Sequence, residues 1–199
     1  MAVSGIILAG GRSLRMGKDK TQLIWGRHTL LEQAVCRLRG LADDILVVGS
    51  LKDTCCLPGI RQVQDRYKGC GPLGGIHAGL LEAKHEAALV LSCDMPFVTA
   101  ELTAFLAAKR EGFAAIVPRY GERVEPLCAV YARSCLPVIE DLLQVGDNQV
   151  RQVFAKLNTC YVEESELQRF GEVKQLFFNL NTPQEWQEAL RRKEEGHGS

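Results

Sequence analysis

Short apolar runs alternate with amphipathic stretches along most of the chain. The runs 3–9, 43–50 and 87–94 are largely apolar, which is typical of strands buried on both faces of a sheet. Further strands are predicted at 60–65, 113–119, 125–132, 159–163 and 176–180. Helices are predicted at 29–40, 99–111, 134–145, 148–157 and 181–192, and a loop at 66–75 leads into another helix that runs through Leu81.

Two of the predicted helices begin with recognisable caps. Thr29 is followed three residues later by Glu32, which is the pattern of a capping box. Thr182 precedes Pro183, the residue type favoured at the first helical position, and Glu185 follows at the third. These caps fix where two helices start.

The alternation of strands and helices predicts an α/β protein with a mostly parallel central sheet and helices on both faces. The 199 residues fit one domain, and neither a repeat nor a linker divides them. We therefore expect a single domain over residues 1–193 and a solvated tail over 194–199. Open α/β sheets bind ligands outside the carboxyl ends of their strands. The segment Gly10–Lys20, Asp65 and Asp94 are expected at that edge.

The charge balance narrows the function classes. The 24 basic residues equal the 24 acidic ones, which argues against a general nucleic-acid-binding or membrane-surface protein. No apolar run has the length of a transmembrane helix, and the N-terminal run is short for a signal peptide. We expect a cytoplasmic protein that binds neither nucleic acid nor membrane.

The eight cysteines do not have the spacing of a metal site. No C-x-x-C pair occurs, and none of the four histidines lies at zinc-ligand spacing from a pair of cysteines. Several cysteines lie in apolar runs, where a thiol behaves as a small hydrophobic side chain. We expect reduced, structural thiols.

The segment GIILAGGRSLRMGKDK, residues 5–20, ends a predicted strand in two glycines and then gathers four basic side chains. It is not a P-loop, because five residues separate Gly11 from Gly17 where that motif has four. In addition, Asp19 follows Lys18 where the motif has a hydroxyl for magnesium. It is not a dinucleotide fingerprint either, because the glycine spacing differs and no helix is predicted directly after it.

Two interpretations of this segment stay open on spacing alone. Gly10 and Gly11 would let main-chain N–H groups approach phosphate oxygens, and Arg15, Lys18 and Lys20 would neutralise a triphosphate. Alternatively, the segment is a glycine turn whose basic side chains are solvated.

Four motifs favour the phosphate-binding interpretation over the solvated turn. LAGGRSLRMGKDK closely resembles the signature of the molybdenum cofactor guanylyltransferases, a family of the nucleotidyltransferase superfamily. VQDRYKGCGPLGGI resembles that family's Asp and G-P-L-[AG]-G-I segment, LSCDMPFV resembles its C-D-x-P strand end, and FFNLNTPQEW resembles its closing N-x-N-T-P motif. The motifs occur in the family's order and span residues 5–186, nearly the whole chain.

The resemblance implies a three-layer, Rossmann-like nucleotidyltransferase fold. It also implies a Mg²⁺-dependent enzyme that transfers GMP from GTP to the terminal phosphate of molybdopterin, or of its molybdenum-loaded form, and releases pyrophosphate. A phosphate monoester has a second pKa of about 6, so the acceptor is largely dianionic at neutral pH and needs no general base. Transient contact with proteins that deliver the cofactor is a further expectation.

The resemblance also assigns site residues. The expected catalytic residues are Arg15, Lys20 and Asp94, of which Asp94 also holds the metal. The expected nucleotide-binding residues are Leu8, Ala9, Gly10, Gly11, Lys20, Asp65 and Asp94. Asn179 and Asn181 are expected on the pterin side, and Arg119, Arg123 and Pro126 where a second substrate could dock. Three of these have structural alternatives: Asp94 could only cap or turn the chain before Pro96, Asp65 could simply form a turn, and Asn181 could belong to a helix cap.

One position departs from the family pattern. Relatives often carry an asparagine just beyond the strand that corresponds to ILVV, where this chain has Gly49 and Ser50. Other groups must then read the base. The double glycine Gly10–Gly11 leaves room near the base and favours a purine.

Other functions stay open. A cytidylyltransferase of molybdopterin, or a nucleotidyltransferase with another phosphate acceptor, would use similar residues. A nucleotide-binding regulator without turnover would tolerate the loss of Asp94. A dehydrogenase is disfavoured, because the dinucleotide fingerprint is absent.

Overall fold

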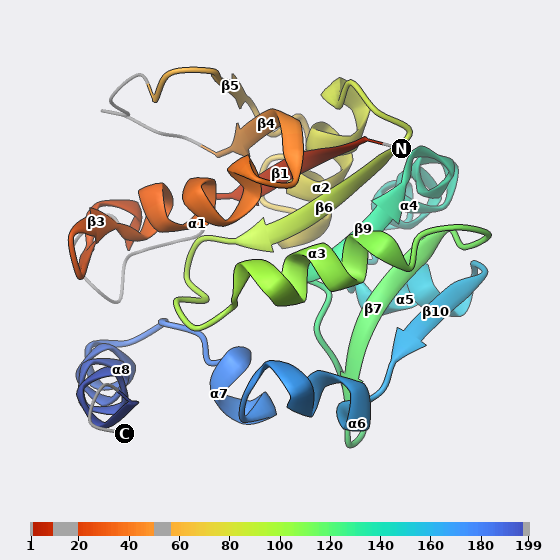
Figure 1. The fold of residues 1–199 in the computed structure, drawn as a ribbon. Helices are drawn as coiled ribbons and strands as arrows, with labels where there is room; N and C mark the ends of the chain where they lie inside the picture. The colour runs from red at the N-terminus through yellow and green to blue at the C-terminus, as the bar shows by residue number, and fades with distance from the viewer. Residues whose placement is uncertain (1, 10–19, 50–56, 197–199) are drawn as a thin grey trace.

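The computed structural model describes residues 2–9, 20–49 and 57–196. Its centre is an eight-stranded sheet (Figure 1). The strands are β1 (Val3–Leu8), β4 (Ala42–Val48), β5 (Ile60–Val63), β6 (Ala87–Ser92), β7 (Ala115–Tyr120), β8 (Arg123–Val124), β9 (Cys128–Ala132) and β10 (Thr159–Val162). Their order across the sheet is β10-β7-β9-β6-β1-β4-β5, with β8 paired to β7.

Most strand pairs are parallel, as predicted. Within β6-β1-β4-β5 every neighbouring pair is parallel, and so is the pair of β7 and β10. Strand β9 runs antiparallel to β6 and β7, and β8 runs antiparallel to β7. Because β6, β1, β4 and β5 run in the same direction, their carboxyl ends meet at one edge of the sheet.

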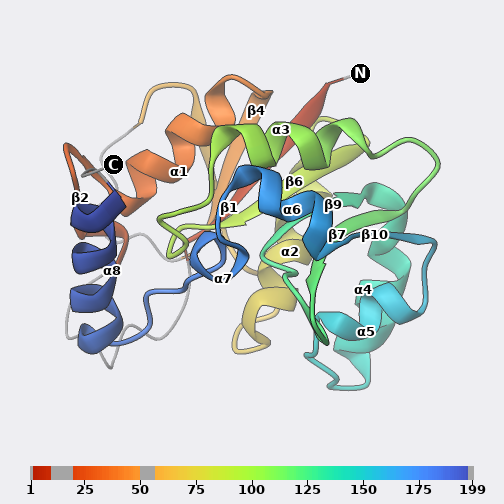
Figure 2. The same ribbon diagram turned by 60° about the horizontal axis from the view of Figure 1, so that its bottom comes forward.

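Helices cover both faces of the sheet, so the fold has three layers, as predicted (Figures 1 and 2). One core cluster contains buried side chains of α1 (Leu30–Arg39), α3 (Ala100–Ala108), α6 (Glu164–Leu167) and α7 (Val173–Leu176). The other contains buried side chains of α2 (Gly71–Glu82), α4 (Leu136–Gln144) and α5 (Arg151–Ala155). Successive residues of β1 alternate between the two clusters, since Ile7 belongs to the first and Ile6 to the second. The described residues also form three 3-10 turns: η2 (Lys20–Gln22), η3 (Arg133–Cys135) and η4 (Gln168–Phe170).

A third, smaller cluster joins the last helix to a short hairpin. The hairpin consists of β2 (Ile24–Trp25) and β3 (His28–Thr29), and the helix is α8 (Pro183–Gly196). The cluster's buried side chains are Trp25, Leu30, Leu180 and Ala189. Periodicity did not predict the hairpin, because two-residue strands carry no measurable period. Helix α8 continues to Gly196, so residues 194–196 are helical where the sequence indicated a tail.

Both predicted helix caps are confirmed. The Glu32 N–H donates to Thr29 Oγ1 at 3.1 Å, and the Thr29 N–H donates to Glu32 Oε2 at 2.6 Å, which completes the capping box. At the start of α8, the Glu185 N–H donates to Thr182 Oγ1 at 3.2 Å.

Two element predictions were wrong. Helix α2 begins at Gly71, so half of the predicted loop 66–75 is helical. Glycine is required in this helix because β1 lies so close that a Cβ on Gly79 would be 2.6 Å from Ile6 Cγ2. The strand predicted at 176–180 is absent, because α7 ends at Leu176 and the chain continues without a strand through the residues described there.

The described residues also bear on membrane, metal and cysteine predictions. None of their helices combines the length and the apolar character needed to cross a bilayer. No group of three or more His, Cys, Asp or Glu side chains among them is arranged to hold a metal. Cys128 and Cys135 are fully buried, and burial raises the pKa of both thiols, to about 11 for Cys135. These two cysteines are therefore unreactive core residues, as predicted.

Candidate active site

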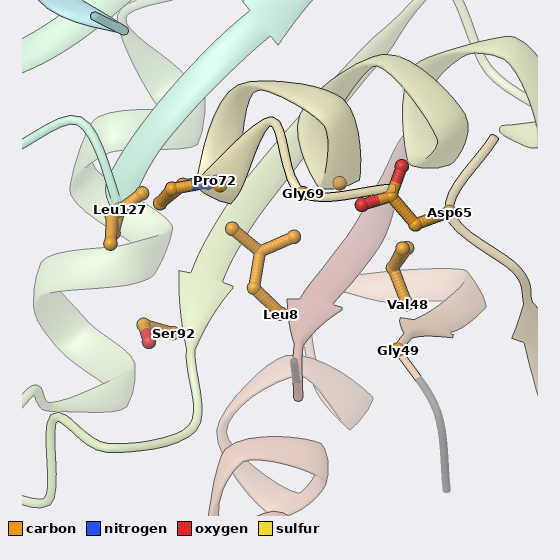
Figure 3. A pocket seen from close by; sticks show the side chains of 10 residues that line it. Leu8, Val48, Gly49, Asp65, Gly69, Pro72, Ser92 and Leu127 are labelled. Carbon is orange, nitrogen blue, oxygen red and sulfur yellow. The ribbon is translucent and has the colours of Figure 1, made fainter. Parts of the chain in front are cut away.

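A cavity of about 760 Å³ opens where β1, β4 and β6 end (Figure 3). Leu8 lies at its centre, with Val48 on one side and Ser92 on the other, and the first turn of α2 lies across it. The lining residues are Leu8, Val48, Gly49, Asp65, Gly69, Gly71, Pro72, Gly75, Ser92 and Leu127. Its size is in the range of small-molecule sites, and its position is the edge predicted for ligand binding.

Asp65 lines this cavity from the segment after β5 (Figure 3). Its Oδ1 accepts a hydrogen bond from the Tyr67 N–H at 2.9 Å, so part of the carboxylate closes a local turn. Helix α2 packs against it so closely that a Cβ on Gly74 would lie 2.9 Å from Asp65 Oδ1. Burial raises the pKa of Asp65, while the Tyr67 hydrogen bond and the charge of His77 oppose the rise. Asp65 is thus a turn-forming residue and a wall of the cavity at once.

Lys20, Asp94 and Asn181 meet beside the cavity, although they come from distant parts of the chain. Lys20 Nζ lies 3.4 Å from Asp94 Oδ2 and donates a hydrogen bond to Asn181 Oδ1 at 2.9 Å. The side chains of Lys20 and Asp94 are each only 17% exposed. An ammonium and a carboxylate of opposite charge are therefore held at the edge where ligands bind.

Three contacts fix the segment that carries Asp94. The Ser92 hydroxyl donates to Asp94 Oδ1 at 2.6 Å and orients the carboxylate. The Leu180 N–H donates to the Asp94 carbonyl at 3.0 Å, and the Cys93 N–H donates to the Leu8 carbonyl at 3.2 Å. The end of β6 is thus tied both to β1 and to the segment before α8.

A second carboxylate, Glu125, lies near Asp94 and was missed by sequence reasoning. Its side chain is buried, with 7% of the residue exposed, and its Oε1 accepts a hydrogen bond from the Leu127 N–H at 3.2 Å. Burial raises the pKa of Glu125 to about 7, the Leu127 hydrogen bond opposes the rise, and the charge of Asp94 adds to it. The only signal in the sequence was an acidic residue at the start of an apolar strand.

A second cavity, of about 700 Å³, is lined by residues of β7, β8 and the segment after α7. Its aromatic wall contains Tyr120 and Phe177, whose rings stack with centroids 5.4 Å apart. The lining residues are Tyr120, Gly121, Glu122, Arg123, Glu164, Lys174, Phe177, Phe178, Asn179 and Glu185. Aromatic, acidic and basic groups therefore converge on a space of ligand size.

Only two of the predicted second-substrate residues line a cavity, because Arg119 is in an ion pair and the Pro126 carbonyl accepts a hydrogen bond from the Tyr131 hydroxyl at 2.8 Å. Arg123 and Asn179 line the second cavity, and the Asn179 amide donates to the Phe177 carbonyl at 3.2 Å. Arg119 pairs with Glu163 through two hydrogen bonds and stacks over Tyr161 at 4.5 Å. Its guanidinium therefore ties β7 to the end of β10.

Of the remaining predicted site residues, Leu8 and Ala9 are among those that the structure describes. Leu8 lines the first cavity, and the Ala9 N–H donates to the Val48 carbonyl at 2.9 Å. Gly10, Gly11 and Arg15 lie outside the described residues.

Gly49, the departure from the family pattern, also lines the first cavity. Its φ of 146° is a backbone conformation that favours glycine. Ser92 and Leu127 were not predicted to line this cavity, although Ser92 had a signal, because it lies two residues before Asp94 in the LSCDMPFV motif.

The oxygen donors at Asp94 suit a magnesium ion. Mg²⁺ prefers oxygen ligands and is commonly bound by one or two carboxylates, with waters and phosphate oxygens completing its shell. Asp94 supplies one oriented carboxylate, and Glu125 would add negative potential near it when it is ionised. This donor set fits the metal better than a site built from cysteine or histidine would.

Comparison with known families identifies this arrangement. A model of the MobA-like NTP transferase domain matches residues 5–160, which include Lys20, Asp65 and Asp94. The chain belongs to this family. It is therefore a nucleotidyltransferase, as the motifs predicted.

Individual relatives agree with this assignment. The chain is 36% identical to a probable molybdenum cofactor guanylyltransferase of Pelotomaculum thermopropionicum, over 92% of this chain and 89% of the relative. It is 37% identical to a protein of the same name from Peptoclostridium acidaminophilum, over 92% and 86% of the two chains. The crystal structure of molybdopterin-guanine dinucleotide biosynthesis protein A from Archaeoglobus fulgidus superposes with a TM-score of 0.82 at 26% identity, covering 97% of this chain and 100% of that one.

Proposed function

We propose that this nucleotidyltransferase transfers GMP from GTP to the terminal phosphate of molybdopterin. The observation that carries the proposal is the Lys20–Asp94 pair beside the first cavity, at the strand ends where α/β enzymes bind their substrates. The names of the relatives, which are molybdenum cofactor guanylyltransferases, support the choice of nucleotide and acceptor.

In the proposed reaction, an oxygen of the acceptor phosphate forms a bond to the α-phosphorus of GTP. The bond from that phosphorus to the oxygen bridging to the β-phosphorus breaks, and both its electrons leave with pyrophosphate. The acceptor is already largely dianionic at neutral pH, so the protein need not remove a proton. Catalysis then consists of positioning and charge neutralisation, which the clustered charges of Lys20 and Asp94 can provide.

Each residue has a defined part in this proposal. Asp94 holds a magnesium ion, which when bound would offset the negative charge of the phosphates. Lys20 faces the same space and neutralises phosphate oxygens, and Arg15 is proposed to assist from the glycine-rich segment. Asn181, which accepts a hydrogen bond from Lys20, keeps the ammonium aimed at the phosphates.

The two cavities are proposed to hold the two substrates. The first, lined by Asp65 and the start of α2, would take the guanosine, with the Asp65 carboxylate accepting from base or ribose groups. The second, lined by Asn179 and the stacked pair Tyr120–Phe177, would take the planar pterin. Asp94, which accepts a hydrogen bond from the cavity-lining Ser92, would then lie near the phosphates of the bound nucleotide.

The test is pyrophosphate release with molybdopterin, Mg²⁺ and each nucleoside triphosphate in turn. We expect release with GTP, loss of release to background in Asp94→Asn, and unchanged release in the control Asp43→Asn, which alters an exposed residue at the start of β4. Release with CTP in place of GTP would retain the mechanism and overturn the nucleotide assignment. GTP binding without any release would favour another acceptor or a binding protein without turnover.

Three related expectations stay predictions: a cytoplasmic location, use of the metal-free or the molybdenum-loaded pterin, and contact with cofactor-delivering proteins.

A further inference from the structure

Arg37 on α1 reaches across to the segment that follows Asp94. Its Nη1 donates to the Met95 carbonyl at 3.5 Å, and its Nη2 donates to the Pro96 carbonyl. These are the two residues directly after the proposed metal ligand. A planar guanidinium can hold two acceptors at once in a fixed geometry, which a single ammonium cannot.

The charge of Arg37 has no carboxylate partner among the residues that the structure describes. Arg37 forms no ion pair with those residues, and its side chain is partly buried. Burial lowers the pKa of Arg37 to about 10, so the group is still charged at neutral pH. Burying a cation costs free energy unless hydrogen bonds replace its lost hydration. Here those hydrogen bonds go to main-chain carbonyls of the Asp94 segment.

The other end of α1 is connected to Lys20. The Leu30 N–H, at the first residue of α1, donates to the Leu23 carbonyl at 2.9 Å, and the Leu23 N–H donates to the Lys20 carbonyl at 3.1 Å. The capping box at Thr29 fixes this end of the helix. Helix α1 therefore contacts the Lys20 turn at its start and, through Arg37, the Asp94 segment near its end.

We propose that Arg37 is a positioning residue, which sets the place of the Asp94 carboxylate relative to Lys20 by holding the Met95 and Pro96 carbonyls. The inference rests on the proposed function, because it assumes that Asp94 binds the metal. Mg²⁺ demands near-ideal octahedral geometry, so a small displacement of its ligand matters. The Ser92 and Leu180 hydrogen bonds still hold Asp94 when Arg37 is changed, so the loss should be partial.

The experiment compares Mn²⁺ affinity, followed by electron paramagnetic resonance with GTP present, in the wild-type protein and three variants. Arg37→Gln should weaken Mn²⁺ binding by about 10- to 100-fold, the range seen when groups that orient metal ligands are removed. Arg37→Lys should bind several-fold more weakly than wild type, because an ammonium can reach only one of the two carbonyls well. Arg39→Gln is the matched control on the same helix; Arg39 is exposed and contacts the Pro58 carbonyl at 3.4 Å, so its loss should leave affinity unchanged.

Two further readouts separate positioning from stability. For Arg37→Gln, pyrophosphate release at low Mg²⁺ should fall, and excess Mg²⁺ should restore most of it. Urea unfolding reports how much stability is lost. A variant that loses stability but keeps wild-type Mn²⁺ affinity would overturn the proposal.

The remaining outcomes are also decisive. If Arg37→Gln does not fold, Arg37→Lys carries the test, and wild-type affinity in that variant would overturn the inference. If the wild-type protein itself binds no Mn²⁺ with GTP, the metal assignment of the proposed function has failed and the inference falls with it. Weaker binding in both Arg37 variants, with the Arg39 control unchanged, supports the role.

Discussion

Replacing Glu125 by glutamine should change the free energy of unfolding more favourably at alkaline pH than at acid pH, when each variant value is compared with wild type. Glu125 is buried at the start of the turn before β9, and burial raises the pKa of its carboxyl group from an ordinary 4.5 to about 7. The folded protein therefore holds this proton more tightly than the unfolded chain does. Between about pH 4.5 and pH 7 the folded state binds more protons, so the stability that this group contributes is lost as the pH rises through that window.

The size of the effect follows from the two pKa values. Proton affinity that differs by one pKa unit corresponds to about 1.4 kcal/mol, so the change from 4.5 to about 7 corresponds to about 3 kcal/mol. Wild-type protein should pay this cost fully only above pH 7, where a charged carboxylate must stay buried. Glutamine has a similar shape but does not titrate, so its variant should show no such cost.

The assay is urea unfolding with EDTA present, at intervals from about pH 4 to pH 8.5. The free energy of unfolding of Glu125→Gln minus that of wild type should grow by about 3 kcal/mol from the acid to the alkaline end of this range. Glu122→Gln is the matched control, because Glu122 is an exposed carboxylate three residues away, on the turn between β7 and β8. Its difference from wild type should stay nearly constant. A constant difference for Glu125→Gln as well would show that the carboxyl group titrates normally and would refute the reasoning.

The other predictions concern close packing and a buried carboxylate. Gly79→Ala should destabilise the protein by about 1–3 kcal/mol in urea, because the added Cβ would meet Ile6 Cγ2 at 2.6 Å. Gly74→Ala should weaken GTP binding by about tenfold in calorimetry, because the added Cβ would lie only 2.9 Å from Asp65 Oδ1 and displace the carboxylate. Asp44→Asn should cost about 2 kcal/mol in urea at pH 7, since Asp44 Oδ2 is buried and accepts from the Ser4 hydroxyl at 2.7 Å. Burial alone would raise the pKa of Asp44, but its hydrogen bonds outweigh burial and lower it. The stability that Asp44 contributes should therefore be lost as the pH falls through the folded-state pKa.

Two of these predictions have a matched control variant, and each has a result that would contradict it. Gly40→Ala should be nearly neutral, because no atom lies within 4 Å of the added Cβ. If Gly79→Ala were equally neutral, the close approach of α2 to β1 would be wrong. Asp43→Asn changes the exposed neighbour of Asp44, and an equal loss in both variants would contradict the role of burial. Wild-type GTP affinity in Gly74→Ala would remove Asp65 from the nucleotide site.

Local signals made parts of the fold predictable. The capping box of Thr29 and Glu32 depends on residues three apart, so the sequence contains the whole interaction. The meeting of Lys20 and Asp94 was also predictable, because parallel strands deliver their carboxyl ends to the same edge. Asn181, which contacts Lys20, was predicted as a site residue from the N-x-N-T-P motif and not from any pattern of hydrophobicity.

Features that depend on tertiary contacts could not be read from the chain. Gly74 and Gly75 were placed in a predicted loop, but the close approach of Asp65 and Leu8 explains why a helix needs glycine at these positions. The run 176–180 has the composition of a strand. Its residues Leu176, Phe177 and Leu180 are buried, but they lie at the end of α7 and in the irregular segment after it. The burial of Glu125 and the reach of Arg37 likewise depend on elements far away in sequence.

The central claim is that the α-phosphate of GTP is transferred to molybdopterin. The most direct measurement uses GTP radiolabelled in either the α- or the γ-phosphate, with molybdopterin, Mg²⁺ and purified protein, followed by separation of the pterin product. The account predicts that α-label appears in the pterin product, that γ-label appears in pyrophosphate, and that Asp94→Asn abolishes both. Gamma-label in the pterin product, or α-label found only in free GMP, would contradict it.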